Sequence, residues 1–227
     1  YAIYAETSFP GENRLLLIGT DVSTRYTMRS ASMYSRIAGY IAGAAEGKKG
    51  NYMAFFPSYK MMQEVYEYFL EQAGEIDAAI QSQNMSEQER ESFLSLFEKE
   101  RDRSFVGFCV MGGIFSEGID LTEDRLIGAI IVGTGLPQVC NDREIVRSYF
   151  EDHGMAGFDY AYLYPGMNKV LQSAGRVIRT ERDRGMILLL DDRFRQRQYR
   201  DIFPREWEGI RICSAQSLPA YLEEFWK

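Results

Sequence analysis

The sequence predicts an α/β fold in which a mostly parallel sheet is flanked by helices on both faces. Two observations lead to this prediction. Short apolar segments alternate with amphipathic segments along the chain, and the apolar segments are bounded by Gly, Pro, Asn or Asp, as strands usually are. Such alternation is typical of parallel sheets covered by helices. The expected strands are Arg14–Ile18, Tyr52–Phe56, Ile76–Ile80, Phe105–Val110, Leu126–Val132 and Met186–Leu190.

The expected helices carry start signals and apolar stripes of their own. Ser58 follows Pro57 and is a suitable N-cap for a helix over residues 59–72. Ser86 and Glu89 form a capping-box pattern for a helix that runs to about Glu100. The side chains expected to face inward are Met62, Tyr66, Phe69 and Leu70 in the first helix, and Phe93, Leu94 and Phe97 in the second. Further helices are expected at about Arg29–Ala45, Arg143–Phe150, Asn168–Arg179 and Leu218–Lys227.

Length and composition fit one large globular domain. The chain has 227 residues, of which 45% are apolar and 26% charged. We expect a single domain over 1–227, with residues 1–48 as its less regular lead-in segment. The longest apolar run, Leu126–Leu136, is too short to cross a bilayer, and the N-terminus shows no signal-peptide pattern. We therefore expect a cytoplasmic protein with no membrane partner.

Metal-binding patterns are missing from the sequence. The cysteines Cys109, Cys140 and Cys213 lie far apart and include no C-x-x-C pair, and His153 is the only histidine. No zinc or iron–sulfur site is expected from such a set. We expect reduced and mostly buried thiols, with His153 in a solvated turn.

Charge is distributed unevenly along the chain. The formal net charge is −7, which disfavours a protein that coats nucleic acid non-specifically. Residues 169–211, however, hold ten Arg and one Lys against seven acidic residues, a local charge of +4. A local basic face on an acidic domain is suited to a directed contact with phosphate.

Two segments resemble nucleotide-binding motifs but differ from them in detail. Gly43–Gly50 has three residues between its glycines, instead of the four of a P-loop, and lacks the Ser or Thr that ligates Mg²⁺. We interpret it as a hydrophilic turn. Gly133–Gln138 follows an apolar run, but Gln138 replaces the third glycine of a G-x-G-x-x-G fingerprint. A dinucleotide-binding α/β enzyme domain therefore remains an alternative that rests on a partial match.

A stronger signal lies between Gln172 and Arg179, where the sequence has the pattern Q-x-x-G-R-x-x-R. On a helix, Gln172, Gly175, Arg176 and Arg179 would share one face. Glycine costs a helix about 1 kcal/mol relative to alanine, so the small size of Gly175 should serve a purpose. Two guanidinium groups on one face suit a polyphosphate. The alternative is a surface helix whose arginines pair with nearby acidic residues.

A second signal follows the strand expected over 105–110. The pattern G-G-x-x-S-E-G-I-D contains three glycines, which let the backbone turn sharply or pass close to a ligand. Ser116, Glu117 and Asp120 would present polar groups from this loop. Taken alone, the loop could also be a structural turn, which is the alternative interpretation.

Together, these two segments resemble motifs VI and V of superfamily 2 helicases, in the form found in the XPD/DinG-like family. Asn51–Tyr59 is similar to the motif IV strand and turn of that family, and Gly135–Pro137 and Thr180–Gly185 resemble further family features. The resemblance covers nearly the whole chain, most clearly residues 50–192. The stretch after Pro137 departs from it, because it contains fewer prolines than the family pattern.

The resemblance implies a RecA-like three-layer fold and the C-terminal motor half of an ATP-dependent DNA helicase. In this family, ATP binds between two RecA-like halves and single-stranded DNA crosses both. The N-terminal half supplies the phosphate-binding lysine, the acidic Mg²⁺ box and usually a four-cysteine module for a 4Fe-4S cluster, none of which is present in this sequence. The isolated chain is therefore expected to be inactive.

The resemblance also assigns roles to individual residues. Arg179 would act as the arginine finger on the γ-phosphate, with Arg176 supporting it and Gln172 sensing the nucleotide or its attacking water. Asp120 would couple the nucleotide cleft to DNA. Further nucleotide-binding residues would be Glu117, Gly118 and Gly175, and the expected DNA contacts are Ser58, Tyr59, Ser116, Thr24 and Arg25. A non-catalytic nucleic-acid-binding domain that keeps the same fold is the other alternative.

Overall fold

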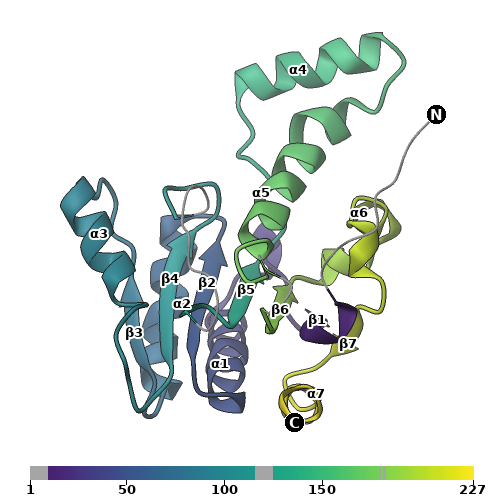
Figure 1. Ribbon diagram of the computed structural model, residues 1–227. Coiled ribbons are helices and arrows are strands. Elements are labelled where there is room, and N and C mark those ends of the chain that lie inside the picture. The colour runs from purple at the N-terminus through teal and green to yellow at the C-terminus, as the bar shows by residue number, and fades with distance from the viewer. Residues whose placement is uncertain (1–9, 116–124, 179, 181–182) are drawn as a thin grey trace.

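The computed structural model describes residues 10–115, 125–178, 180 and 183–227. In this part of the chain, seven strands form one sheet in the order β3-β4-β2-β5-β6-β1-β7, and every neighbouring pair is parallel (Figure 1). The expected α/β class with a parallel sheet is therefore confirmed. The strands are β1 (Arg14–Gly19), β2 (Asn51–Phe56), β3 (Asp77–Ile80), β4 (Phe105–Val110), β5 (Gly128–Val132), β6 (Gly185–Leu190) and β7 (Arg211–Cys213).

The edge strand β7 was not expected from the sequence. It has only three residues, and two of them, Arg211 and Ile212, are exposed. A half-exposed strand of this length has no run of apolar residues that could reveal it. The six expected strands all form, each within about two residues of the predicted bounds.

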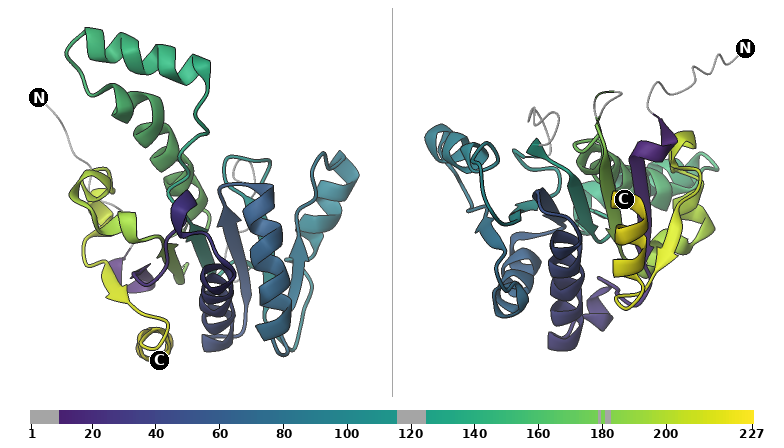
Figure 2. Two further views of the ribbon diagram at one scale, coloured as in Figure 1. Left: turned by 180° about the vertical axis from the view of Figure 1, so that it is seen from behind. Right: turned by 60° about the horizontal axis from the view of Figure 1, so that its bottom comes forward.

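Helices cover both faces of the sheet (Figures 1 and 2). The helices α1 (Ala31–Gly47), α2 (Tyr59–Gln72) and α7 (Leu218–Trp226) pack on one face, and α3 (Glu87–Ser95), α5 (Tyr164–Ala174) and α6 (Arg197–Arg200) pack on the other. Alternate strand residues point into the two cores, as Leu17 and Ile18 of β1 illustrate. The short turns of 3-10 or π helix are η1 (Gly11–Asn13), η2 (Tyr26–Met28), η4 (Asp159–Leu163), η5 (Asp192–Arg195) and η6 (Arg205–Trp207).

The remaining helix, α4 (Asn141–Asp152), lies away from the sheet in Figure 1 and in the left panel of Figure 2, and it buries none of its residues. His153 follows the last residue of this helix. Its ring is exposed, and its Nδ1 lies 2.7 Å from the Tyr149 carbonyl oxygen. The expectation of a solvated turn at His153 is confirmed.

The predicted start of α2 is confirmed, but the prediction that Leu70 belongs to its buried face is wrong. The Ser58 hydroxyl accepts a hydrogen bond from the Met61 N–H at 3.3 Å, and the helix has the predicted bounds. Leu70 is 57% exposed, whereas Val65 is fully buried. The face that packs on the sheet is therefore centred on Val65 and Phe69, and Leu70 lies beyond its edge.

The capping box of α3 is confirmed, but the helix is shorter than predicted. The Ser86 hydroxyl accepts from the Glu89 N–H at 3.3 Å, and the Glu89 carboxylate accepts from the Ser86 N–H at 2.7 Å. These hydrogen bonds lower the pKa of the Glu89 carboxyl. The helix ends at Ser95 rather than near Glu100. Phe93 and Phe97 are nevertheless both buried against β4.

The described part of the lead-in segment is built into the sheet. Leu15 to Ile18 of β1 are buried between β6 and β7, and α1 begins at the Ser30 N-cap and packs on α2. The Walker-like stretch Gly43–Gly50 spans the end of α1 and the turn before β2, where a turn was predicted.

Candidate functional site

The loops that follow four adjacent strands meet at the carboxyl edge of the sheet. They leave β1, β2, β5 and β6, and they enclose a pocket of about 150 Å³. The connection after β2 leads toward β3 and β4 on one side of the sheet, and the connection after β5 leads toward β6 on the other side. The pocket therefore lies beside the position where the strand order reverses. Ligands of open parallel sheets usually bind there. The lining residues are Thr24, Arg25, Tyr26, Arg29, Pro57, Thr134, Gly135, Leu136 and Arg193.

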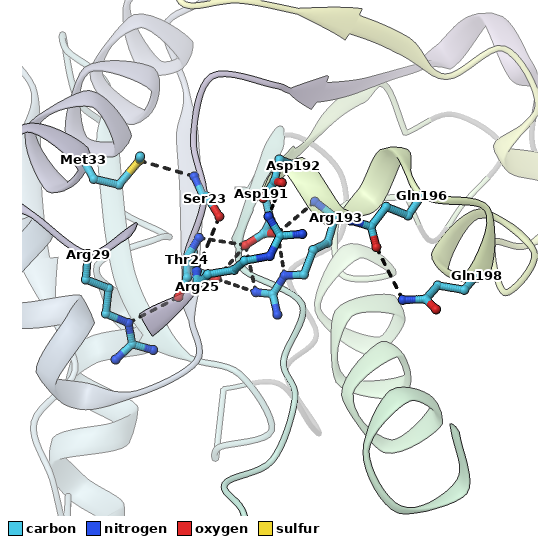
Figure 3. Close-up of polar contacts among 10 residues, drawn as sticks. All are labelled: Ser23, Thr24, Arg25, Arg29, Met33, Asp191, Asp192, Arg193, Gln196 and Gln198. Carbon is cyan, nitrogen blue, oxygen red and sulfur yellow. Dashed lines mark hydrogen bonds and ion pairs between the residues drawn. The ribbon is translucent and has the colours of Figure 1, made fainter. Parts of the chain in front are cut away.

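A buried carboxylate fastens two of these loops together (Figure 3). Asp191, at the end of β6, is fully buried. It accepts from the Thr24 N–H at 2.9 Å and from the Thr24 hydroxyl at 2.6 Å. Arg193 donates from Nε to one carboxylate oxygen at 2.8 Å and from Nη2 to the other at 2.9 Å. Burial alone would raise the pKa of Asp191, but the hydrogen bonds and charge of Arg193, together with the Thr24 donors, outweigh it and hold that pKa below its usual value.

This network changes the interpretation of Thr24. The residue is 5% exposed, and its hydroxyl both donates to Asp191 and accepts from Arg193 Nη2 at 2.8 Å. Its side chain therefore holds the loop in place, with the hydroxyl engaged within the protein. The neighbouring Arg25 side chain is 39% exposed and pairs through Nη1 with Asp192.

The turn after β2 is linked to the ends of β3 and β4. The Tyr59 hydroxyl accepts from Gln81 Nε2 at 2.9 Å, and Gln81 Oε1 accepts from the Val110 N–H at 2.9 Å. Gln81 is only 3% exposed. Sequence reasoning did not single it out, although a polar residue directly after a strand was the available signal. Ser58 and Tyr59 are both half-buried, and each has a hydroxyl engaged within the protein.

The helix that carries Gln172 runs antiparallel to the strands. Near its start, Gly166 closely approaches the Thr134 carbonyl at the carboxyl end of β5. Beyond its end, Val177 packs directly on Gly185 at the amino end of β6. Gln172 and Arg176 therefore lie toward the opposite edge of the sheet from the pocket.

The comparisons with known proteins decide the family. The helicase C-terminal domain family matches residues 41–209, which is more than half of the chain. This chain belongs to the helicase C-terminal domain family, in its XPD/DinG-like form. It is 27% identical over 181 residues to the ATP-dependent DNA helicase XPD of Sulfolobus acidocaldarius, covering 78% of this chain and 31% of that protein. It is 25% identical over 213 residues to the 3′-5′ exonuclease DinG of Staphylococcus saprophyticus, covering 93% of this chain and 22% of that protein.

Solved structures of helicases share the same fold. An apo XPD structure superposes with a TM-score of 0.72 at 23% identity, over 88% of this chain and 40% of that chain. The XPD-related protein of S. tokodaii superposes with a TM-score of 0.59 at 19% identity, over 88% of this chain and 38% of that chain. These neighbours confirm the RecA-like fold. The chain spans about a third or less of the length of the curated relatives it matches.

The sequence had predicted that Gln172, Gly175, Arg176 and Arg179 share one helical face. This is wrong for Arg176, which lies beyond the end of the helix. The helix α5 ends at Ala174, and Gly175 caps it by donating from its N–H to the Leu171 carbonyl at 2.9 Å. The glycine ends the helix instead of packing within it, so Gln172 is helical and Arg176 is not. Gln172 and Gly175 are exposed and Arg176 is half-buried, whereas Arg179 lies outside the described residues.

The helicase motif V is described only at its start. Met111 donates its N–H to the Phe56 carbonyl at 2.8 Å, and Phe115 is fully buried beside Phe93. Gly112 has a φ of +68°, which agrees with the expectation of a sharp turn. The assigned residues Ser116, Glu117, Gly118 and Asp120 lie outside the described residues.

The glycines of the dinucleotide-like segment have another explanation. A Cβ on Gly133 would lie 2.8 Å from the Thr24 hydroxyl, and a Cβ on Gly135 would lie 2.7 Å from the Gly166 carbonyl oxygen. No helix opens at this turn, since α4 starts only at Asn141. Close approach of neighbouring loops therefore accounts for both glycines, and the dinucleotide alternative loses its support.

Thiols and metal ligands add no further site in the described part of the chain. Cys109 and Cys213 are buried, Cys140 is exposed and all three are free, so the expectation of mostly buried thiols holds for two of them. Burial raises the pKa of Cys213 to about 12. Within the described ranges, no cluster of three His, Cys, Asp or Glu side chains suits a metal ion. No helix among those residues is long and apolar enough to span a bilayer.

Proposed function

We propose that this chain is the second motor half of an ATP-dependent DNA helicase, and that it completes an ATP site built mainly by an N-terminal RecA-like half. The position of Arg176 carries the proposal. It follows the end of α5 next to the start of β6, together with Gln172, at the opposite edge of the sheet from the arginine-lined pocket. Two polar regions at two edges suit a motor that binds nucleotide with one and DNA with the other.

At the nucleotide edge, we assign the arginine finger to Arg179. Phosphoryl transfer needs positioning and stabilisation of charge on the γ-phosphate, and a planar guanidinium supplies both. Arg176 supports the same phosphates or the interface between the halves, and Gln172 senses the nucleotide. Gly175 lies next to Arg176. We also propose that Glu117 and Gly118 contribute to nucleotide binding and that Asp120 couples the nucleotide to DNA. Mg²⁺ is held by carboxylates of the other half, and any 4Fe-4S cluster belongs to that half as well.

At the carboxyl edge, we assign contacts with single-stranded DNA to the turn of Ser58 and Tyr59, to Arg25 and to Ser116. Such contacts are to phosphates and base faces and do not depend on sequence. Thr24 acts by holding the Arg25 loop, because its own hydroxyl is buried in the Asp191 network.

DNA-stimulated ATP hydrolysis by the complete protein that contains this chain tests the proposal. The wild type should hydrolyse ATP in the presence of a dT oligonucleotide, and Arg176→Ala should lower kcat while the oligonucleotide still binds. If the complete protein binds DNA but hydrolyses no ATP, it is instead a non-catalytic nucleic-acid-binding protein with a RecA-like fold.

A further inference from the structure

A lysine of α5 reaches across to the turn that begins motif V. Lys169 is half-buried, and its Cγ, Cδ and Cε atoms lie against Gly112. A Cβ added to Gly112 would lie 3.0 Å from both Cδ and Cε of the lysine. Gly112 follows β4 and has a φ of +68°, so a glycine there serves the turn and also leaves room for the lysine. The Lys169 side chain therefore joins the motif VI helix to the start of the motif V turn.

The ammonium group at the end of this side chain has no counter-ion among the described residues. Nζ is bonded to Cε, so its charge lies beside the turn at Gly112. No hydrogen bond or ion pair within the described ranges engages it. A lysine that only covers the protein surface also extends its charge into water in this way. The two roles differ in one respect, which is whether the charge matters as well as the methylene groups.

Both surfaces that hold the lysine are fixed by buried contacts. On the side of the turn, the Val110 N–H donates to Oε1 of the buried Gln81 at 2.9 Å. On the side of the helix, Met167 and Val170 are fully buried in the core next to the sheet. A side chain confined between two such surfaces loses little conformational freedom when its end group binds a ligand.

The next polar side chain on this face of α5 is Gln172. It follows Lys169 by three residues, close to one helical turn, and it is exposed. Lys169 is also the one lysine among the ten arginines of residues 169–211. A lysine is a compact charge with three N–H donors and binds a single phosphate oxygen well, whereas a planar guanidinium prefers to bind two oxygens at once. The ammonium and the amide together suit a phosphate group that lies along α5.

The position of Lys169 favours a nucleotide as the source of that phosphate. The arginine-lined pocket at the carboxyl edge is formed by the loops after β1, β2, β5 and β6, and Lys169 is not among its lining residues. The lysine contacts the turn after β4 instead. From Lys169, α5 leads to Gln172 and then to Arg176, which we assign to the nucleotide.

We propose that the Lys169 ammonium binds a phosphate of the nucleoside triphosphate in the cleft between this chain and the N-terminal half. This inference rests on the proposed helicase function and adds to it a residue that lies outside the Q-x-x-G-R-x-x-R pattern. The ammonium contacts the nucleotide before and during phosphoryl transfer alike, so Lys169 contributes to nucleotide affinity rather than to the rate of the chemical step.

Lys169→Met separates the charge from the methylene groups, because methionine keeps an unbranched side chain over Gly112. The assay uses the complete protein with a saturating dT12 strand. The KM for ATP should rise about ten-fold while kcat changes little, since a charge-assisted hydrogen bond is lost from the bound substrate and from the transition state equally. The Kd of a fluorescent, non-hydrolysable ATP analogue should rise by the same factor.

Two further substitutions test whether the KM follows charge or packing. Lys169→Arg keeps the positive charge and should leave the KM within about three-fold of the wild type. Lys169→Glu reverses the charge and should raise the KM further than Lys169→Met does. A side chain that acts only by covering Gly112 would give no such order, because methionine would then be the best replacement.

Lys99→Met is the matched control. Lys99 is an exposed lysine beyond the end of α3, and its loss should leave KM, kcat and the Kd of the analogue unchanged. The nucleotide-free proteins carrying Lys99→Met or Lys169→Met should melt at the same temperature as the wild type. Binding of a fluorescein-labelled dT12 strand without nucleotide, measured by anisotropy, should also be the same for all three.

Two results would overturn this role of Lys169. One is an unchanged KM and Kd in a Lys169→Met protein that still shows DNA-stimulated ATPase activity, which would reduce the lysine to a cover for Gly112 and leave the helicase function intact. The other is weaker binding of dT12 by Lys169→Met with an unchanged KM for ATP, which would assign the ammonium to the DNA backbone. A wild-type protein whose ATPase activity does not respond to DNA would instead remove the proposed function itself.

Discussion

Arg193 Nε lies 2.8 Å from the buried carboxylate of Asp191, two residues earlier in the loop after β6, and both side chains bind Thr24 in the loop after β1 (Figure 3). The Asp191 side chain is fully buried, and that of Arg193 is 15% exposed. Thr24 adds two further hydrogen bonds to the same carboxylate from a position 167 residues earlier in the chain. The pair therefore determines how the proposed DNA edge is assembled.

Replacing the carboxylate should destabilise the protein strongly. Asp191→Asn removes the charge that Arg193 faces and should lower the free energy of unfolding by about 3–5 kcal/mol at pH 7, because a largely buried guanidinium is left without its partner. Urea denaturation measures this. Asp201→Asn, which breaks the exposed Arg197–Asp201 pair, is the matched control and should change stability by less than about 1 kcal/mol. Equal effects of the two substitutions would contradict this interpretation of Asp191.

The pH dependence of that difference follows from the direction of the pKa shift. The folded pKa of Asp191 lies below its unfolded value, so its contribution is complete above an unfolded pKa of roughly 3.9 and is lost as the pH falls through the folded pKa. The stability gap between wild type and Asp191→Asn should stay constant from pH 7 to about pH 5 and shrink below about pH 4. A gap that already closes near pH 6 would show that another group titrates.

Local signals in the sequence were enough for most of the fold. Ser58 and the apolar spacing after it set the bounds of α2, and Ser86 with Glu89 set the start of α3, because capping depends on residues only three positions apart. The family motifs were also recognisable from short patterns. The error at Leu70 arose because a helical stripe has an edge that spacing alone does not locate.

Longer-range features could not be predicted in the same way. Thr24 and Asp191 are brought together only by the order of β1 and β6 in the sheet, and the same holds for the pocket that includes Thr134. The pattern around Gly175 fits a helix as well as it fits a helix end. The end is marked by the Arg176 and Val177 N–H groups, which donate to carbonyls three residues back, at Ser173 and Ala174, instead of four. The sequence therefore indicated residues near both edges of the sheet but not the hydrogen bonds that join Thr24 to Asp191.

The Tyr59 hydroxyl should matter for stability rather than for DNA binding. Tyr59→Phe leaves the buried Gln81 amide without its acceptor and should cost about 1–3 kcal/mol of unfolding free energy. The ring that we assign to DNA stays in place, so affinity for dT12 should hold, whereas Tyr59→Leu should weaken it. Unchanged stability of Tyr59→Phe in urea would show that the Gln81 bridge contributes nothing.

The 227-residue chain by itself should hydrolyse no ATP. The sequence contains neither a P-loop nor the acidic box that holds Mg²⁺, so the phosphates would be neither bound nor neutralised. A phosphate-release assay with and without dT12 measures this. DNA-stimulated turnover by the chain alone would refute the division of the ATP site between two halves.

Binding of single-stranded DNA by the chain alone should be weak, salt-sensitive and indifferent to sequence. The local charge of +4 over residues 169–211 and the three pocket arginines offer few phosphate contacts on a chain of net charge −7. The logarithm of affinity should therefore fall with a shallow slope against the logarithm of salt concentration. Anisotropy titrations of dT12 and of a mixed-sequence strand at several salt concentrations test this, and a strong preference for one sequence would contradict it.

Arg179→Ala, placed in the complete protein, should abolish ATP turnover and unwinding while nucleotide and DNA binding survive. An arginine finger stabilises negative charge that develops in the transition state. Only a contact that is stronger in the transition state than in the bound substrate accelerates phosphoryl transfer. The expected loss in kcat is about 10³–10⁵-fold. Arg179→Lys should rescue poorly, because a point charge does not reproduce a planar donor. Arg182→Ala, just outside the motif, is the control and should retain wild-type turnover. A folded Arg179→Ala protein with normal ATPase activity would defeat the assignment, whereas loss of folding would favour a role for Arg179 in pairing with nearby acidic residues.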